Sequence, residues 1–158
     1  MIYYTSTELM GIKRDFSGTI KGKVDNPQEV LTKGKVSKLE KQTKDAMESY
    51  VKADNTKLDL IPEAGKFGNV IRRKDGINVS QYAVFCPETK KPISFEATAE
   101  DNSVNLKASW DDSGNLASVN STRKFGNKTE AVNFSTTYEN GEKIIKFEEQ
   151  VMIIADEK

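Results

Sequence analysis

The chain of 158 residues contains no histidine and only one cysteine, Cys86. Without histidine, neither a Ser-His or Cys-His nucleophilic pair nor a zinc site of nitrogen and sulfur ligands can form. A single cysteine cannot form an intramolecular disulfide, which indicates a reducing compartment. We therefore expect a non-enzymatic protein that needs no metal or other cofactor.

Long apolar runs and a net charge are also missing. No run approaches the roughly 20 residues that cross a membrane, and 24 basic residues balance 24 acidic ones. The segment Met1–Glu8 lacks the basic region followed by an apolar one that marks a signal peptide. Together with the single cysteine, these features predict a cytoplasmic protein that does not bind membranes.

Turn signals divide residues 65–155 into short segments in which apolar and polar residues alternate, the pattern of antiparallel hairpins. The clearest turns are Asp75-Gly76 and Asn140-Gly141. An earlier strand is predicted around Phe16–Val24, where two glycines indicate a bend or a close approach by another backbone. The strands predicted after it are 67–74, 77–86, 92–99, 103–110, 115–122, 129–138 and 142–155.

One amphipathic helix is predicted near residues 27–53. Asn26 and Pro27 offer an N-cap followed by proline at the first helical position. Apolar residues recur every three or four positions from Val36 to Tyr50 and form one stripe. Gly34 weakens the first turns, so we expect the firm part of the helix after it. The helical lysines are expected to form a solvated face; they are Lys33, Lys35, Lys38, Lys41 and Lys44.

A meander of seven sequential strands must protect its edges, and closure into a barrel is a usual solution. We therefore predict a mainly β (α+β) protein with one β-barrel-like domain over residues 1–158, a helix that covers an end or an open face, and a flexible N-terminal arm at 1–14. Glu149 falls on the apolar face of the last strand, which indicates an inward-facing carboxylate or a bulge that shifts the register. The bulge is favoured, because a buried unpaired carboxylate is costly.

The neutral total hides an uneven distribution of charge. Residues 66–74 and 123–128 contain seven basic residues and no acidic one, and three aromatic residues lie in or beside them. Single-stranded nucleic acid is held by such a mixture, because cations follow the phosphates and aromatic rings stack on bases. The alternative is that the rings belong to the core and the cations protect edge strands from aggregation. The predicted nucleic-acid-binding residues are Lys66, Phe67, Arg72, Arg73, Lys74, Tyr82, Arg123, Lys124 and Phe125.

The segment Asn69–Phe85, with a basic strand, the turn Asp75-Gly76 and an alternating strand that carries Tyr82, resembles the strand–turn–strand of small OB-fold single-stranded-DNA-binding proteins. That family places its helix between the third and fourth strands, whereas the helix expected here precedes nearly all strands. The resemblance implies an OB-like barrel that binds single-stranded DNA and, as in versions encoded by phages or conjugative plasmids, forms oligomers along it. Met1–Thr5 would then pair with the edge of a neighbouring subunit. The alternative function is that of a protein–protein interaction module or inhibitor from a phage or mobile element.

Overall fold

A computed structural model describes residues 12–23, 25–52, 59–61 and 66–154. Within these ranges lie nine strands and one helix. In chain order the elements are β1 (Ile12–Lys21), α2 (Pro27–Lys52), β2 (Asp59–Ile61), β3 (Lys66–Arg72), β4 (Asn78–Phe85), β5 (Pro92–Ala99), β6 (Val104–Trp110), β7 (Leu116–Phe125), β8 (Lys128–Glu139) and β9 (Glu142–Ile153).

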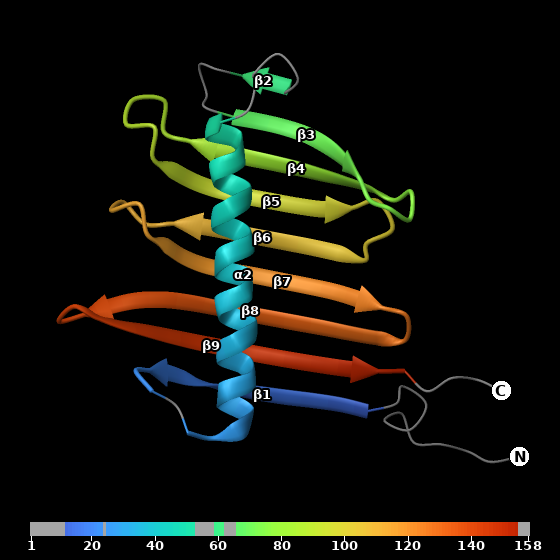
Figure 1. The fold of residues 1–158 in the computed structure, drawn as a ribbon, viewed down its shortest axis with the longest axis vertical. Coiled ribbons are helices and arrows are strands. Elements are labelled where there is room, and N and C mark those ends of the chain that lie inside the picture. Colours follow the sequence, from blue (N-terminus) through green and yellow to red (C-terminus); the bar gives the residue numbers. More distant parts are fainter. Residues whose placement is uncertain (1–11, 24, 53–58, 62–65, 155–158) are drawn as a thin grey trace, which may run out of the picture.

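All nine strands form one antiparallel sheet in the order β1-β9-β8-β7-β6-β5-β4-β3-β2 (Figure 1). The eight strands that follow the helix are neighbours in sequence order, so the predicted meander and the mainly β class are confirmed. The first strand joins the sheet at the far side, beside the last.

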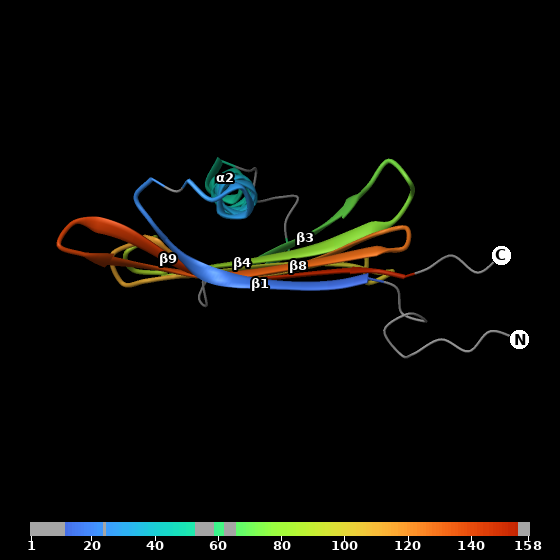
Figure 2. The ribbon, with the colours of Figure 1, turned by 90° about the horizontal axis from the view of Figure 1, so that it is seen from below.

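The sheet bows around α2, which crosses the strands on the concave side (Figure 2). It is not closed into a barrel: β1 and β2 are its two ends within the described ranges. The predicted OB-like barrel is therefore not confirmed. The physical reason is that the helix occupies the concave side, so it buries the apolar face that a closed barrel would otherwise bury against itself.

The helix begins where the sequence predicts. Asn26 caps it, because its Oδ1 accepts a hydrogen bond from the backbone N–H of Gln28 at 2.9 Å. The Asn26 carbonyl accepts the first helical bond from Val30, also at 2.9 Å. The helix then runs through Gly34 without a break to Lys52, so the weakness expected in its first turns does not end it.

Gly34 offers a test of the helix. A Cβ atom at this position would meet no heavy atom within 4 Å. We expect Gly34→Ala to raise the free energy of unfolding by up to about 1 kcal/mol, because alanine loses less backbone freedom in a helix than glycine does. Urea denaturation followed by circular dichroism measures this gain, and an unchanged or lower midpoint would contradict it.

The core lies between α2 and the face of the sheet that we call the helix-side face; the opposite face is the outer face. Val36, Leu39 and Met47 bring the apolar stripe of α2 onto this core. Gly18 of β1 lies against the ring of Phe147, since a Cβ at Gly18 would be 3.2 Å from its Cζ. The sequence predicted a bend or a close approach by another backbone at the glycines of this strand, whereas the atoms against Gly18 belong to an aromatic side chain. The sheet supplies the other buried apolar residues, which include Ile20, Val79, Ala83, Phe95, Ala97, Ala108, Val119, Val132, Phe134, Ile145 and Phe147.

Glu149 faces inward, and the prediction of a bulge is wrong. The pairings of β9 with β1 and with β8 pass through Glu149 without a shift in register. Its side chain is 3% exposed and contacts α2. Thr32 Oγ1 lies 2.9 Å from one carboxylate oxygen, and Lys35 Nζ lies 2.5 Å from the other. These partners compensate the burial that made the inward orientation improbable from the sequence.

The N-terminal predictions fall mostly outside the described residues. Of the arm predicted at 1–14, residues 12–14 belong to β1, and the rest lies outside. Met1–Thr5, the segment predicted to pair with a neighbouring subunit, also lies outside the described residues. No helix in the described ranges is long and apolar enough to cross a membrane.

Candidate nucleic-acid interface

The nine residues predicted to bind nucleic acid are divided between the two faces of the sheet. Side chains alternate along a strand, so Arg123 and Phe125 share the helix-side face of β7 with the buried Val119. Lys124 lies between them and therefore points to the outer face. In β4, Tyr82 precedes the buried Ala83 and is 58% exposed on the outer face.

The β3–β4 turn carries three of the predicted cations. Arg72, at the end of β3, and Lys74, in the turn, are exposed. Arg73 donates to Asp75 Oδ2 at 2.8 Å and to Ser103 Oγ at 2.8 Å, and its guanidinium lies 3.6 Å from Asp101. The hydrogen bond with Asp75 raises the pKa of Arg73, and Arg73 in turn lowers the pKa of Asp75. Arg73 thus joins two turns, and its charge is compensated there.

Lys66 and Phe67 belong to β3, where their backbones pair with Val84 and Ala83. Their side chains lie outside what the structure describes. Of the nine predicted residues, the structure brings Arg123 and Phe125 together on the helix-side face. It places Tyr82 and Lys124 on the outer face.

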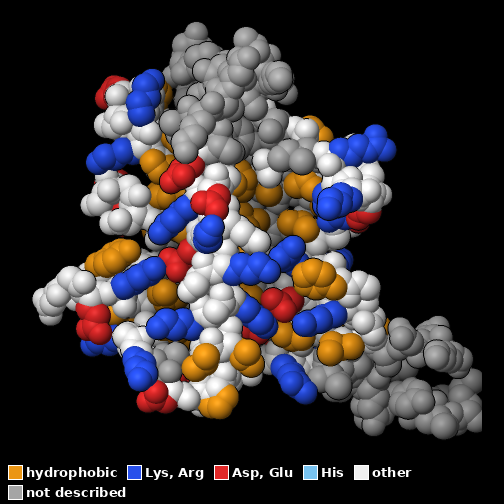
Figure 3. Space-filling view, in the orientation of Figure 1, with side chains coloured by type: hydrophobic (Ala, Val, Ile, Leu, Met, Phe, Trp, Pro, Cys, Tyr) orange, Lys and Arg blue, Asp and Glu red, His pale blue; other side chains and the backbone are white. Residues whose placement is uncertain are grey.

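Arg123 and Phe125 open into a cavity of about 440 Å³ between α2 and strands β7 and β8, which we call the basic cleft. Four cations and one carboxylate line it. Figure 3 shows the helix side of the molecule, where blue Lys and Arg side chains gather along α2 and beside it. The full lining is Lys35, Lys38, Leu39, Gln42, Ser121, Arg123, Phe125, Lys128, Glu130 and Val132.

Two cations of the basic cleft are not neutralised. Lys35 and Lys128 lie 3.4 and 3.5 Å from Glu130. By contrast, no ion pair of Lys38 or Arg123 occurs in the described part of the chain. The guanidinium carbon of Arg123 lies 5.2 Å from the centroid of the Phe125 ring. That ring is 48% exposed, so the cleft offers an aromatic face beside positive charge.

The contribution of the helix was missed by sequence reasoning, which assigned its lysines to a solvated face. Lys35 and Lys38 line the basic cleft together with Leu39 and Gln42. A signal was present, because residues three and four positions apart share a helix face: the buried Leu39 follows Lys35 by four positions, and Gln42 follows Lys38 by four. The sequence could not show which part of the sheet that face meets.

A smaller cavity of about 140 Å³, the inner pocket, lies beside the basic cleft, on the side of β5 and β6. The two cavities share Leu39, Gln42, Ser121 and Arg123 as a common wall. The other residues of the inner pocket are Thr43, Phe95, Ala97, Val104 and Leu106. The charged basic cleft thus adjoins a mainly apolar space.

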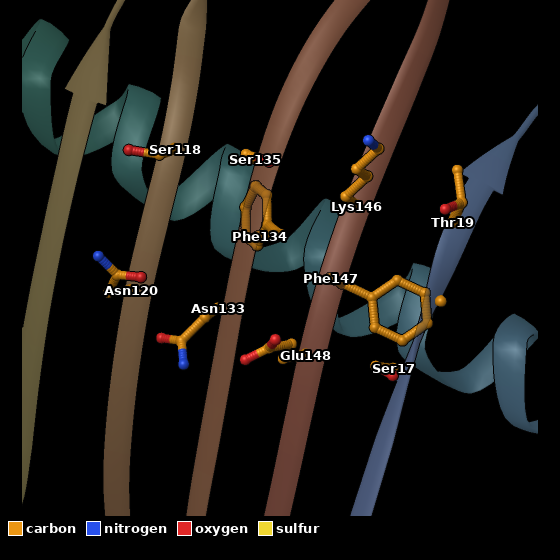
Figure 4. A pocket seen from close by; sticks show the side chains of 11 residues that line it. Ser17, Thr19, Ser118, Asn120, Asn133, Phe134, Ser135, Lys146, Phe147 and Glu148 are labelled. Carbon is orange, nitrogen blue, oxygen red and sulfur yellow. The ribbon is translucent and has the colours of Figure 1, made fainter.

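The outer face carries a shallow cavity of about 510 Å³ with different chemistry. Figure 4 shows the side chains that line it, with α2 behind the strands. Its charged groups are one lysine and one glutamate, which cancel. This surface therefore has no excess positive charge for phosphates. Its polar lining consists of Ser17, Thr19, Ser118, Asn120, Asn133, Ser135, Lys146 and Glu148.

No protein-family model, curated protein or solved structure matches this chain. The class of protein is therefore defined here by fold and site alone: an open antiparallel sheet with one helix across its concave face and a basic, aromatic cleft beside that helix. Such a cleft is suited to binding an anion that also has a flat ring.

Proposed function

We propose that this chain is a non-enzymatic protein that binds single-stranded nucleic acid in the basic cleft. The observation that carries the proposal is that Lys38 and Arg123, two cations without an ion pair among the described residues, and an exposed aromatic ring, Phe125, line one cavity. Cations that follow phosphates and a ring that stacks on a base are the two elements by which proteins hold single strands.

The proposed contact residues differ from the set inferred from the sequence. Arg123 and Phe125 are kept, and Lys38 and Lys128 join them from α2 and β8. The binding surface is then a cleft between helix and sheet, in contrast to the groove of an OB barrel. Single strands suit this cleft better than a duplex, because the bases of a duplex are stacked in its interior and cannot lie on Phe125.

A protein–protein interaction module is the second candidate, and the outer face is the observation that favours it. Tyr82 is 58% exposed there on a face whose central charges cancel, and tyrosine is enriched in protein interfaces. The two functions differ in their response to salt. Binding through phosphates weakens steeply as salt rises, whereas an interface centred on apolar contacts changes little.

Fluorescence anisotropy with a labelled thirty-nucleotide single strand of mixed sequence tests the proposal. We expect micromolar or tighter binding at low salt and weaker binding to the duplex of the same sequence. With two to four phosphate contacts and a slope near −0.7 for each, affinity should fall by about 7- to 50-fold between about 50 and 200 mM salt. Absence of binding at low salt, or binding that ignores salt, would reject the proposal in favour of a protein partner.

A further inference from the structure

Thr43 holds a buried hydroxyl whose hydrogen-bonding capacity is unused. Its residue is 1% exposed, and Oγ1 has no hydrogen-bond partner in the described part of the chain. Buried polar groups are nearly always satisfied in folded proteins, and each exception calls for an explanation. Thr43 lines the inner pocket, so a ligand in that pocket would lie next to its side chain.

The walls of the inner pocket combine apolar surface with a few polar groups. Leu39, Phe95, Ala97, Val104 and Leu106 supply the apolar surface. The polar groups are the hydroxyls of Thr43 and Ser121, the side-chain amide of Gln42 and, in the wall shared with the basic cleft, the guanidinium of Arg123. Ligand pockets typically have this composition, in which the polar groups fix the orientation of the ligand.

These polar groups favour a heteroaromatic ring over an alkyl chain. An alkyl chain would fill the apolar space but would leave the Thr43 hydroxyl unpaired. A nucleobase has flat apolar faces for Leu106 and Phe95 and an edge of donors and acceptors for Thr43. Threonine samples two side-chain rotamers in a helix, and a rotation of Thr43 toward the base breaks no side-chain hydrogen bond within the described part of the chain.

The size of the inner pocket selects among the bases. Its volume is about 140 Å³, and a protein cavity of about 150 Å³ is sufficient to bind one benzene ring. One six-membered ring therefore matches this volume more closely than the two fused rings of a purine do. Among the bases, this favours the pyrimidines.

The inner pocket is also placed where a bound strand would deliver a base. Arg123 and Gln42 belong to its wall and to that of the basic cleft. We propose that the inner pocket holds one pyrimidine base of the strand whose phosphates lie in the basic cleft, with Thr43 Oγ1 hydrogen-bonded to the edge of that base. The inference rests on the proposed function and adds base selectivity to it.

The test measures by fluorescence anisotropy how labelled fifteen-nucleotide oligo-dT and oligo-dA strands bind to the wild-type protein and to Thr43→Val. The matched control is Thr122→Val, because the Thr122 side chain lies on the outer face of β7. We expect the wild type to prefer oligo-dT. Thr43→Val should weaken oligo-dT binding by about five- to tenfold, the usual effect of one hydrogen bond, and leave oligo-dA binding and the salt slope unchanged. Thr122→Val should change neither.

Thermal unfolding of the variants separates a binding role from a structural one. Because Thr43 Oγ1 has no hydrogen-bond partner among the residues that the structure describes, Thr43→Val should melt at the same or a higher temperature. A lower melting temperature, or an unchanged preference for oligo-dT in this variant, would overturn the inference while leaving the proposed function standing. If the wild type binds neither oligonucleotide, both fail.

Pyrimidine strands are sometimes preferred merely because their backbones are flexible. Such a preference would be the same in wild type and Thr43→Val. Only a change in the ratio of oligo-dT to oligo-dA affinity between these two proteins therefore supports a base in the inner pocket.

Discussion

Replacing Lys38 and Arg123 together by glutamine is expected to weaken binding of the single-stranded thirty-mer by about 100-fold at low salt. Both cations line the basic cleft, and neither has an ion pair in the described chain. A hydrogen bond to a charged group contributes about 1.5 kcal/mol or more. Two lost contacts therefore amount to about 3 kcal/mol, which corresponds to two orders of magnitude in the dissociation constant.

The salt dependence gives a second measurement on the same variant. Each phosphate contact contributes about −0.7 to the slope of log affinity against log salt on single strands. The slope for Lys38→Gln/Arg123→Gln should therefore be shallower by about 1.4 than that of the wild type. A loss of affinity without this change of slope would indicate that the side chains act on folding and do not contact phosphates.

A matched control removes the same charge from the opposite face. Lys107 in β6 and Lys146 in β9 are exposed on that face, the outer face of the sheet. Lys107→Gln/Lys146→Gln should bind the thirty-mer within about twofold of the wild type, because screening limits the influence of charges more than about 10 Å away. Equal losses in both double variants would move the site away from the basic cleft, and a loss confined to the control would assign binding to the face that carries Tyr82.

The division of the predicted cations between two faces has a simple geometric cause. Consecutive basic residues do not form one charged patch when they belong to a strand, because neighbouring side chains lie on opposite faces of the sheet. Arg123 and Lys124 are separated in this way. Aromatic residues separate in the same way. Sequence analysis identified Arg123 and Phe125, but their companion Lys38 lies 85 residues earlier in the chain, and only packing of α2 on β7 brings it to them.

The strands were predictable because their signals are local. Asp75-Gly76 and Asn140-Gly141 fix two hairpin turns in which Gly76 and Gly141 adopt positive φ angles of 86° and 79°. Curvature is not local, so the alternating pattern that predicts β4 to β9 does not say whether the sheet closes. In this protein the sheet stays open because the helix between β1 and β2 crosses its concave face from β1 to about β3 (Figures 1 and 2).

Glu149 shows the same limit at the level of one residue. A carboxylate on the apolar face of a strand is costly when it has no partner, and that rule favoured a bulge. The partners are Thr32 and Lys35 in α2, more than 110 residues away in sequence. The rule itself holds, since the buried carboxylate is paired; the sequence lacked the information about which side chains would reach it.

Lys35→Met is expected to lower the free energy of unfolding by about 2–3 kcal/mol at neutral pH. Lys35 is the cationic partner of Glu149, and the substitution leaves that carboxylate buried with Thr32 as its remaining recorded donor. Loss of one partner from a buried ion pair typically costs about 3–5 kcal/mol. The expected value is smaller because the Lys35 side chain is 34% exposed, which allows water to screen the pair. Urea denaturation measures the difference.

A second substitution distinguishes loss of the charge pair from loss of packing. In Lys35→Met/Glu149→Leu both charges are gone, and apolar replacement of a whole buried pair is often neutral. This double variant should therefore recover most of the stability lost in Lys35→Met. If Glu149→Leu instead adds a further loss, the two residues stabilise the protein independently, and the charge pair is not the cause.

The difference in the free energy of unfolding between the wild type and Lys35→Met should depend on pH in a defined direction. Burial lowers the pKa of Lys35, but the hydrogen bond and the negative charge of Glu149, together with Glu130, outweigh burial and raise this pKa above its ordinary value of 10.5. A raised pKa means that the folded state holds the proton more tightly than the unfolded state does. The contribution of Lys35 is therefore complete below pH 10.5 and is lost as the pH rises through its folded-state pKa. The difference in the free energy of unfolding between wild type and Lys35→Met should stay constant from pH 7 to about 9 and become smaller above about pH 11. A difference caused by lost packing alone would not change with pH.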